Sequence, residues 1–268
     1  MIVIGEKING FIPKALAAIE ARDAGYITQI AVSQAESGAD YLDICAGVPP
    51  EREREAMEWL IRTVQEATDL PLCLDSPDPQ VLLEMMGIAA RPGLLNSASM
   101  ENGKCETVFP AIAGTGWSVI ALTCNNDGIP DDPQVKLSIA REIMGLARAY
   151  GIADERLFID PLVTTLATKQ DSLLNFTEGI RLIREEFPQV HFTSGLSNIS
   201  FGMPYRKAIN QQFLCLAMAA GMDSAIMDPT QPDMQAALYA TNALLGRDEY
   251  CMEYLQAYRN GAFGVRPA

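Results

Sequence analysis

The 268-residue sequence contains one histidine, His191, and no two cysteines at the CxxC spacing of metal and redox sites. A zinc site needs several thiolate or imidazole ligands held close together, so this scarcity argues against the common zinc classes. The cysteines are Cys45, Cys73, Cys105, Cys124, Cys215 and Cys251. Because they lie far apart in the chain, they are typical of reduced thiols in a cytoplasmic protein, and we expect no bound metal.

Positive charge is also scarce, with 20 lysine and arginine residues against 34 aspartate and glutamate residues and a formal net charge of −14. No basic cluster interrupts this acidity, which argues against a nucleic-acid partner because phosphate binding requires clustered cations. No apolar run reaches membrane-spanning length, and the first apolar run begins at Ile2, where a signal peptide would have to stand. We therefore expect a soluble cytoplasmic protein with no membrane partner.

What the sequence does contain is a series of eight short apolar runs, each rich in aliphatic residues. Each run ends on a carboxylate or an amide. These final residues are Glu6, Asp43, Asp75, Asn96, Asn125, Asp160, Asn198 and Asp228. Runs of this length and composition are typical of buried parallel strands.

Segments with apolar residues at helical spacing separate these runs. They include residues 52–69, 133–150, 171–187 and 205–221. In the second segment, Asp132 and Pro133 predict a helix start, Val135 belongs to the apolar stripe, and Gly151 predicts the end. Alternation of strand and helix without a break is typical of parallel βα units.

A closed barrel of eight such units has about 250 residues, close to the length of this chain. The sequence therefore predicts an α/β fold in which residues 1–268 form a single (β/α)8 TIM barrel, with residues 249–268 as a terminal helix and tail. An open Rossmann sheet is the rival interpretation, but no GxGxxG follows the first run.

In such a barrel the strand ends meet at one open face, so the polar residues that end the runs should surround one pocket. Asp75, Asn96 and Asp160 end the third, fourth and sixth runs. Carboxylates can accept a paired N–H and NH2 edge, and an amide donates and accepts at once. This set therefore suits a flat heterocycle rich in N–H groups.

Two other interpretations remain open for these side chains. Asp75 in DSPDP (75–79) and Asp160 in DPL (160–162) can cap the helices that follow. Asp43 could join both carboxylates in binding magnesium. His191 lies early in the seventh run, away from its polar end, and we interpret it as a packed side chain.

Five motifs in this order resemble one family. They are GEKING (5–10), LCLDS (72–76), LLNS (94–97), IDPL (159–162) and GLSN (195–198). The chain resembles the pterin-binding barrels, and within them the methyltetrahydrofolate:corrinoid protein methyltransferases. The likeness extends over almost the whole chain, to AMAAGMDSAI (217–226).

This resemblance implies a role for each matched residue. Asp75, Asn96 and Asp160 would hold the pterin, while Asn198 matches the family's catalytic asparagine. Folate binding would also involve Ser197 and Arg206. One departure is Phe201, which stands where the family can carry a glutamine.

The implied reaction is methyl transfer between a corrinoid (cobalamin) protein and N5 of tetrahydrofolate, with 5-methyltetrahydrofolate as the methylated form. Asn198 would place a hydrogen-bond donor near N5, because an amine is a poor leaving group without one. No DxHxxG motif is present, so we expect the corrinoid to arrive on a separate protein. We favour transfer from the methylcorrinoid protein to tetrahydrofolate, and expect a homodimer as in the family's relatives.

Three other functions remain as alternatives. One is the same chemistry in reverse, toward a corrinoid/iron–sulfur protein. Another is dihydropteroate synthase, which carries Ser-Arg-Lys where this chain has Ser197, Asn198 and Ile199 and thus no basic residue. The third is a folate-binding barrel without catalysis, which would bind folate but not exchange methyl groups.

Overall fold

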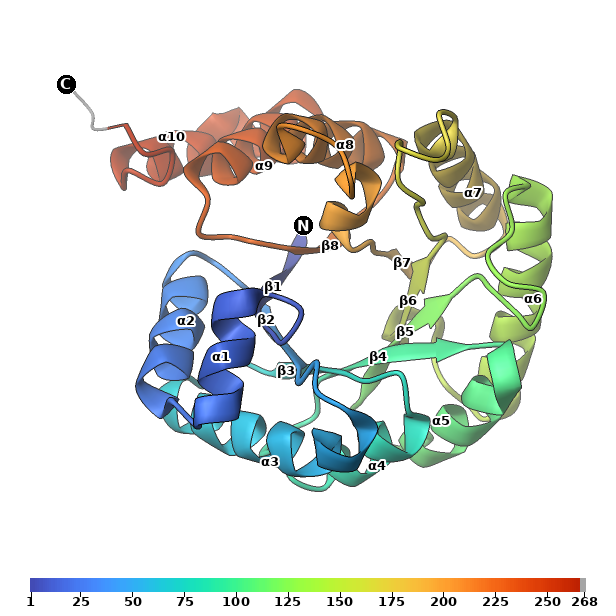
Figure 1. The fold of residues 1–268 in the computed structure, drawn as a ribbon. Coiled ribbons are helices and arrows are strands. Elements are labelled where there is room, and N and C mark those ends of the chain that lie inside the picture. The colour runs from blue at the N-terminus through green and yellow to red at the C-terminus, as the bar shows by residue number, and fades with distance from the viewer. Residues whose placement is uncertain (266–268) are drawn as a thin grey trace.

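The computed structural model describes residues 1–265, in which eight parallel strands alternate with helices (Figure 1). The strands are β1 (Ile2–Asn9), β2 (Tyr41–Cys45), β3 (Leu72–Asp75), β4 (Leu94–Ser99), β5 (Ser118–Leu122), β6 (Leu157–Asp160), β7 (His191–Phe192) and β8 (Ser224–Met227). The helices are α1 (Pro13–Ala21), α2 (Ala24–Glu36), α3 (Pro50–Ala67), α4 (Pro79–Met86), α5 (Lys104–Ile112), α6 (Pro133–Ala149), α7 (Ser172–Glu186), α8 (Arg206–Ala220), α9 (Pro232–Leu244) and α10 (Met252–Arg259). Short 3-10 helices occur at η1 (Glu101–Gly103), η2 (Asp154–Arg156), η3 (Leu196–Ser200) and η4 (Glu249–Cys251).

The strands pair in chain order from β1 to β7, and β8 pairs with the other edge of β1. Between β7 and β8 the barrel is closed by a parallel bridge of Gly195 with Ile226, whose backbone N–H donates to Ser194 at 2.9 Å. The predicted (β/α)8 barrel is therefore confirmed. Because β7 has only two residues, the chain leaves the sheet early at this place.

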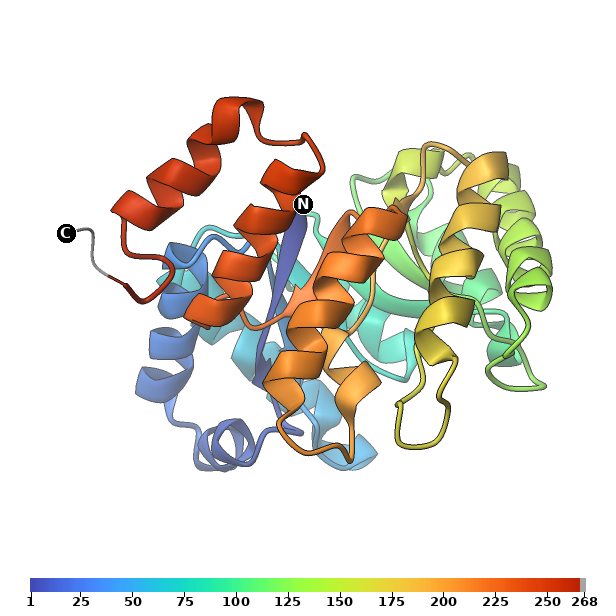
Figure 2. The same ribbon diagram turned by 90° about the horizontal axis from the view of Figure 1, so that it is seen from above.

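Helix α10 lies outside the ring and packs on α9 (Figures 1 and 2). It lies within residues 249–268, where the sequence predicts a terminal helix and tail, and residues 266–268 of that tail lie outside the described part of the chain. Within residues 1–265, no helix combines the length and the apolar character needed to cross a bilayer.

Helix α6 begins as predicted, with the Asp132 side chain accepting a hydrogen bond from the Gln134 backbone N–H at 2.8 Å. The predicted stripe is wrong at its first turn, because Val135 is 43% exposed and Lys136 only 3%. Lys136 shares a face with the buried residues Ala140 and Ile143, which follow at helical spacing. The helix therefore turns a charged side chain toward the barrel.

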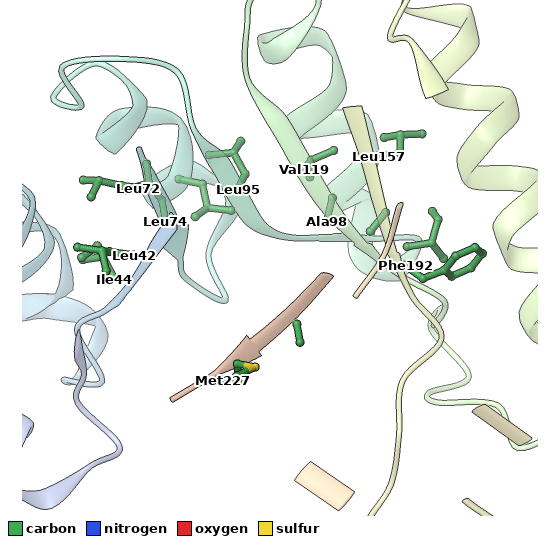
Figure 3. Close-up of a cluster of buried hydrophobic side chains, with 14 of the residues drawn as sticks. Leu42, Ile44, Leu72, Leu74, Leu95, Ala98, Val119, Leu157, Phe192 and Met227 are labelled. Carbon is green, nitrogen blue, oxygen red and sulfur yellow. The ribbon is translucent and has the colours of Figure 1, made fainter. Parts of the chain in front are cut away.

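Alternating side chains divide the core into two parts. One face of the strands packs against the helices, as Figure 3 shows for Leu42, Leu74 and Leu95 among others. The opposite faces supply a second apolar cluster that fills the barrel interior. Its fully buried members are Ile4, Cys73, Leu94, Ile120 and Phe158.

Side chains two residues apart on a strand point to the same side of the sheet. On four of these five strands, the residue two positions after the inner-cluster member is polar and therefore also points into the barrel. On β1 and β3 these are Glu6 and Asp75, and on β4 and β6 they are Asn96 and Asp160. On β2, Asp43 has the same facing because it pairs in register with Cys73. We call these five residues the polar layer, and it lies above an apolar floor at the carboxyl ends of the strands.

Candidate active site

Three members of the polar layer lie side by side on β2, β3 and β4. Asp75 pairs in register with Asn96 and with Cys45, two residues after Asp43. The Asn96 side-chain Nδ2 donates to Asp43 Oδ1 at 3.4 Å. The structure thus brings Asp75 and Asn96 together as expected, and adds Asp43 to them.

Burial decides the protonation of these carboxyls. Asp43 is 1% exposed, and burial together with the neighbouring Asp75 charge raises its pKa well above its ordinary value. Burial raises the pKa of Asp75 to about 6, although a hydrogen bond from Cys45 acts in the opposite direction. At neutral pH Asp75 is therefore mostly ionised and accepts hydrogen bonds, while the Asn96 amide beside it supplies a donor.

Asp160 is the last residue of β6 and is 6% exposed. Its Oδ1 accepts the backbone N–H of Leu162 at 2.8 Å. Burial raises the pKa of Asp160 to about 7, opposed by this hydrogen bond and by the charge of Lys136. Asp160 is thus poised between its neutral and ionised forms near neutral pH.

The predicted position of Asn198 at the end of the seventh strand is wrong, since β7 ends at Phe192 and Asn198 lies in the 3-10 turn η3. Its side chain is exposed. A Cβ placed on Gly195 would lie 3.0 Å from Asn198 Nδ2, so the glycine of GLSN gives this amide its space. The short strand, rather than a longer one, allows the asparagine to project above the polar layer.

The η3 turn is fastened to β1 and to α8. The Ser197 hydroxyl lies 3.3 Å from both carboxyl oxygens of Glu6. Arg206 donates to the Ser197 carbonyl at 2.6 Å and to the Ser200 hydroxyl at 3.0 Å. Ser197 and Arg206, both expected at the folate, thus hold the turn that carries Asn198.

Glu6 was not assigned a role from the sequence, and it lies inside β1 rather than at a strand end. Burial, followed by the nearby Asp228 charge, raises its pKa to about 7, while the Ser197 hydroxyl, Lys7 and Arg206 lower it. A carboxyl in this state can donate to or accept from Ser197. It joins the first strand to the turn that carries Asn198.

The remaining polar ends of the runs serve local structure. Asn125 lies beyond β5 and makes a turn, accepting the Gly128 N–H at 2.9 Å. Asp228 accepts hydrogen bonds from Thr230 and Gln231 and pairs with Lys7 at 3.2 Å; although burial opposes them, these contacts lower its pKa.

The interpretation of His191 as a packed side chain is confirmed. Its Nδ1 lies 3.0 Å from Asp223, and its ring stacks on Phe158 with centroids 4.6 Å apart. Phe201, which stands where the resemblance allows a glutamine, is 69% exposed, and the Arg206 guanidinium lies 5.8 Å from its ring centre.

The alternative roles considered for Asp75 and Asp160 fit the structure less well. Helix α4 is capped by Asp78, whose side chain accepts the Gln80 N–H at 2.9 Å, so Asp75 is free of that task. Asp160 binds the turn at Leu162 rather than a helix end. Among residues 1–265, no three histidine, cysteine, aspartate or glutamate side chains are grouped so as to hold a metal ion.

Residues 16–228, which include the whole polar layer except Glu6, match the family model described as pterin binding enzyme. The chain belongs to the pterin-binding enzymes. It is 47% identical over 266 residues to a methylcorrinoid:tetrahydrofolate methyltransferase of Eubacterium limosum, with 98% of each chain covered. The family that the five motifs resemble is therefore confirmed.

The chain is also similar to less closely related proteins. A methionine synthase of Mycobacterium tuberculosis is 30% identical over 240 residues, which are 85% of this chain and 20% of that protein. A structure of dihydropteroate synthase from Xanthomonas albilineans in complex with 7,8-dihydropteroate superposes with a TM-score of 0.63, covering 92% and 93% of the two chains. At 22% identity this second likeness shows a shared fold.

The Glu6–Ser197 contact of this pterin-binding enzyme predicts a measurable effect on η3. Glu6→Leu keeps a similar volume but removes the acceptor, and a lost hydrogen bond of about 1 kcal/mol corresponds to about fivefold faster opening. Amide hydrogen exchange of residues 196–200 should quicken by that factor. Glu6→Gln keeps an acceptor oxygen and should exchange at the wild-type rate. Equal rates in Glu6→Leu and wild type would show that β1 does not hold the turn.

Proposed function

We propose that the chain is a methyltransferase that moves a methyl group from a methylcorrinoid protein to N5 of tetrahydrofolate. The observation that carries this proposal is its 47% identity to the methylcorrinoid:tetrahydrofolate methyltransferase, which extends over 98% of both chains. The polar layer and the exposed Asn198 above it supply the residues such a reaction needs. The direction rests on the activity for which that relative is named, since the reverse transfer would use the same groups.

The polar layer is well suited to a pterin ring. Ionised Asp75 and Asp160 can each accept N–H groups from the pyrimidine edge, in charge-assisted hydrogen bonds worth about 1.5 to 3 kcal/mol each. Asn96 offers both a donor and an acceptor, and is itself held by Asp43. The inner apolar cluster below would support the ring from beneath.

Asn198 is the residue that we assign to the chemical step. The corrinoid, brought by its own protein, would supply a cobalt that exchanges the methyl group with N5. The Asn198 amide carries a donor and an acceptor, so it can hold N5 in either charge state without titrating itself. Ser197, Glu6 and Arg206 fix the turn beneath it, which preorganises the amide.

This assignment predicts that Asn198→Ala lowers turnover by about 10²- to 10³-fold, the usual loss for a positioned donor, while tetrahydrofolate affinity changes far less. Methyl exchange between methylcobalamin and tetrahydrofolate would report turnover, and fluorescence quenching would report affinity. Asn260→Ala, at an exposed asparagine after α10, is the matched control. Undiminished exchange in Asn198→Ala would remove Asn198 from the mechanism. Tight folate binding without exchange in the wild type would instead favour a binding module.

We further propose that the chain is a cytoplasmic homodimer that acts as one domain. All six cysteines lie within the described residues as free thiols, as is usual in a reducing compartment. Large apolar side chains are exposed near the α9–α10 corner, among them Leu244 at 86% and Tyr250 at 85%. Light scattering should give twice the 29.1 kDa of one chain, and a Leu244→Glu, Tyr250→Glu variant should give a smaller mass. A monomeric wild type would contradict the dimer.

A further inference from the structure

Lys136 is a charged residue that the proposed mechanism does not use, although it is 3% exposed. Lysine is rarely buried to this extent unless its ammonium group finds a partner. On α6 it lies on the apolar face, in line with Ala140 and Ile143. Its side chain therefore reaches inward, toward the carboxyl end of β6.

The Lys136 ammonium donates to the backbone carbonyl of Leu162 at 2.9 Å. Leu162 has a φ of +56°, the left-handed conformation that residues with a side chain seldom adopt. Its N–H group donates to Asp160 Oδ1 at 2.8 Å. The two polar groups of this strained residue are thus held by a carboxylate on one side and a lysine on the other.

The packing of α6 against α7, neighbours in the ring (Figure 1), leaves room for the lysine stem. At Gly179 of α7, an added Cβ would lie 3.5 Å from Lys136 Cδ and 3.4 Å from Pro161 Cβ. Any side chain larger than alanine would compete with the lysine for this space. Gly179 therefore lets a charge from the outer helix reach the turn after β6.

We propose that Lys136 is a positioning residue for the pterin site, which fixes the Asp160–Leu162 turn from below and favours the ionised form of Asp160. This inference rests on the proposed function, in which Asp160 accepts hydrogen bonds from the pterin. It adds a residue from α6, on the outer layer of the barrel, to the machinery of the mouth.

The charges around Asp160 support this role. Lys136 lowers the pKa of Asp160, which burial has raised to about 7. Burial lowers the pKa of Lys136, while Asp160 and Asp131 raise it, and Asp131 is itself paired with Lys169. Of the strands beside β6, β5 carries no charged residue and β7 carries only His191, at the other end. Across the barrel, the polar layer contributes the carboxyls of Glu6, Asp43 and Asp75.

The consequence for pH dependence has a definite sign. Ionised Asp160 accepts pterin N–H groups, so affinity should fall as the pH drops through its pKa. Without the Lys136 charge that pKa is higher, and the loss of affinity begins at higher pH. Lys136→Met should therefore move the midpoint up by about one pH unit and weaken binding about fivefold at pH 7, where the ionised fraction of Asp160 falls from about one half to about one tenth. Lys136→Arg keeps the charge and should keep the midpoint.

The test is tetrahydrofolate affinity by fluorescence quenching between about pH 6 and 8.5, for wild type, Lys136→Met, Lys136→Arg and Asp160→Asn. Asp75, with a pKa of about 6, titrates in every variant, so the difference between variants reports Lys136. An upward shift in Lys136→Met alone supports the inference. An unchanged midpoint in folded Lys136→Met overturns it, because a purely structural lysine would alter stability without moving a titration.

A double variant and the Asp160→Asn variant keep the outcomes distinct. If Lys136→Met does not fold, adding Leu162→Gly relieves the left-handed strain, and the upward shift should persist in that double variant; its absence there counts equally against the inference. If Asp160→Asn leaves affinity unchanged at all pH values, the pterin anchor of the proposed function fails. If Asp160→Asn weakens binding and Lys136→Met does not, only the role of Lys136 fails.

Discussion

In a closed barrel of parallel strands, only every second side chain of a strand points into the interior. The site at the mouth of this barrel depends on which residues occupy those inward positions. An apolar layer around Ile4 and Phe158 closes the floor. The next inward places belong to carboxyls and an amide, which the narrow barrel keeps together and away from water. Burial then raises the pKa of Asp75 to about 6 and that of Asp160 to about 7, while burial and the Asp75 charge raise the pKa of Asp43. The mouth thereby offers carboxyls that can accept hydrogen bonds beside the Asn96 amide, which donates and accepts at once.

Contacts between elements far apart in the chain hold the turns at the mouth of the barrel. Glu6 on β1 holds Ser197, and Arg206 on α8 holds the same residue through its carbonyl, so two elements far apart in sequence fix the turn of Asn198. In the same manner, Lys136 on α6 holds the carbonyl of Leu162, which lies two residues after Asp160. The residues proposed to meet the substrate, Asn198 and Asp160, are thus held by contacts from other elements. Such fixed positions suit a reaction whose metal belongs to a partner protein.

Sequence patterns were sufficient for the eight units, the start of α6, and the places of Asp75, Asn96 and Asp160 on three strands. They located the ends of β3 and β6 at Asp75 and Asp160. The ends of β1, β2 and β4 are wrong, because strand pairing continues beyond Glu6, Asp43 and Asn96. The predicted strand position of Asn198 is wrong because no local sequence pattern indicates that β7 has only two residues. Lys136 was missed because its charge suggests a solvent face, although its spacing to Ala140 and Ile143 matches the buried one. Supports of this kind depend on tertiary neighbours such as Gly179, which no local pattern reveals.

The central claim, that the buried polar layer is the pterin site, is tested most directly by a crystal structure of the protein with tetrahydrofolate. We expect the N–H and NH2 edge of the pterin to lie within about 3 Å of Asp75 and Asp160, with Asn96 beside it and Asn198 facing N5. A pterin bound at another surface, or bound in the mouth without contacting either carboxylate, would contradict it.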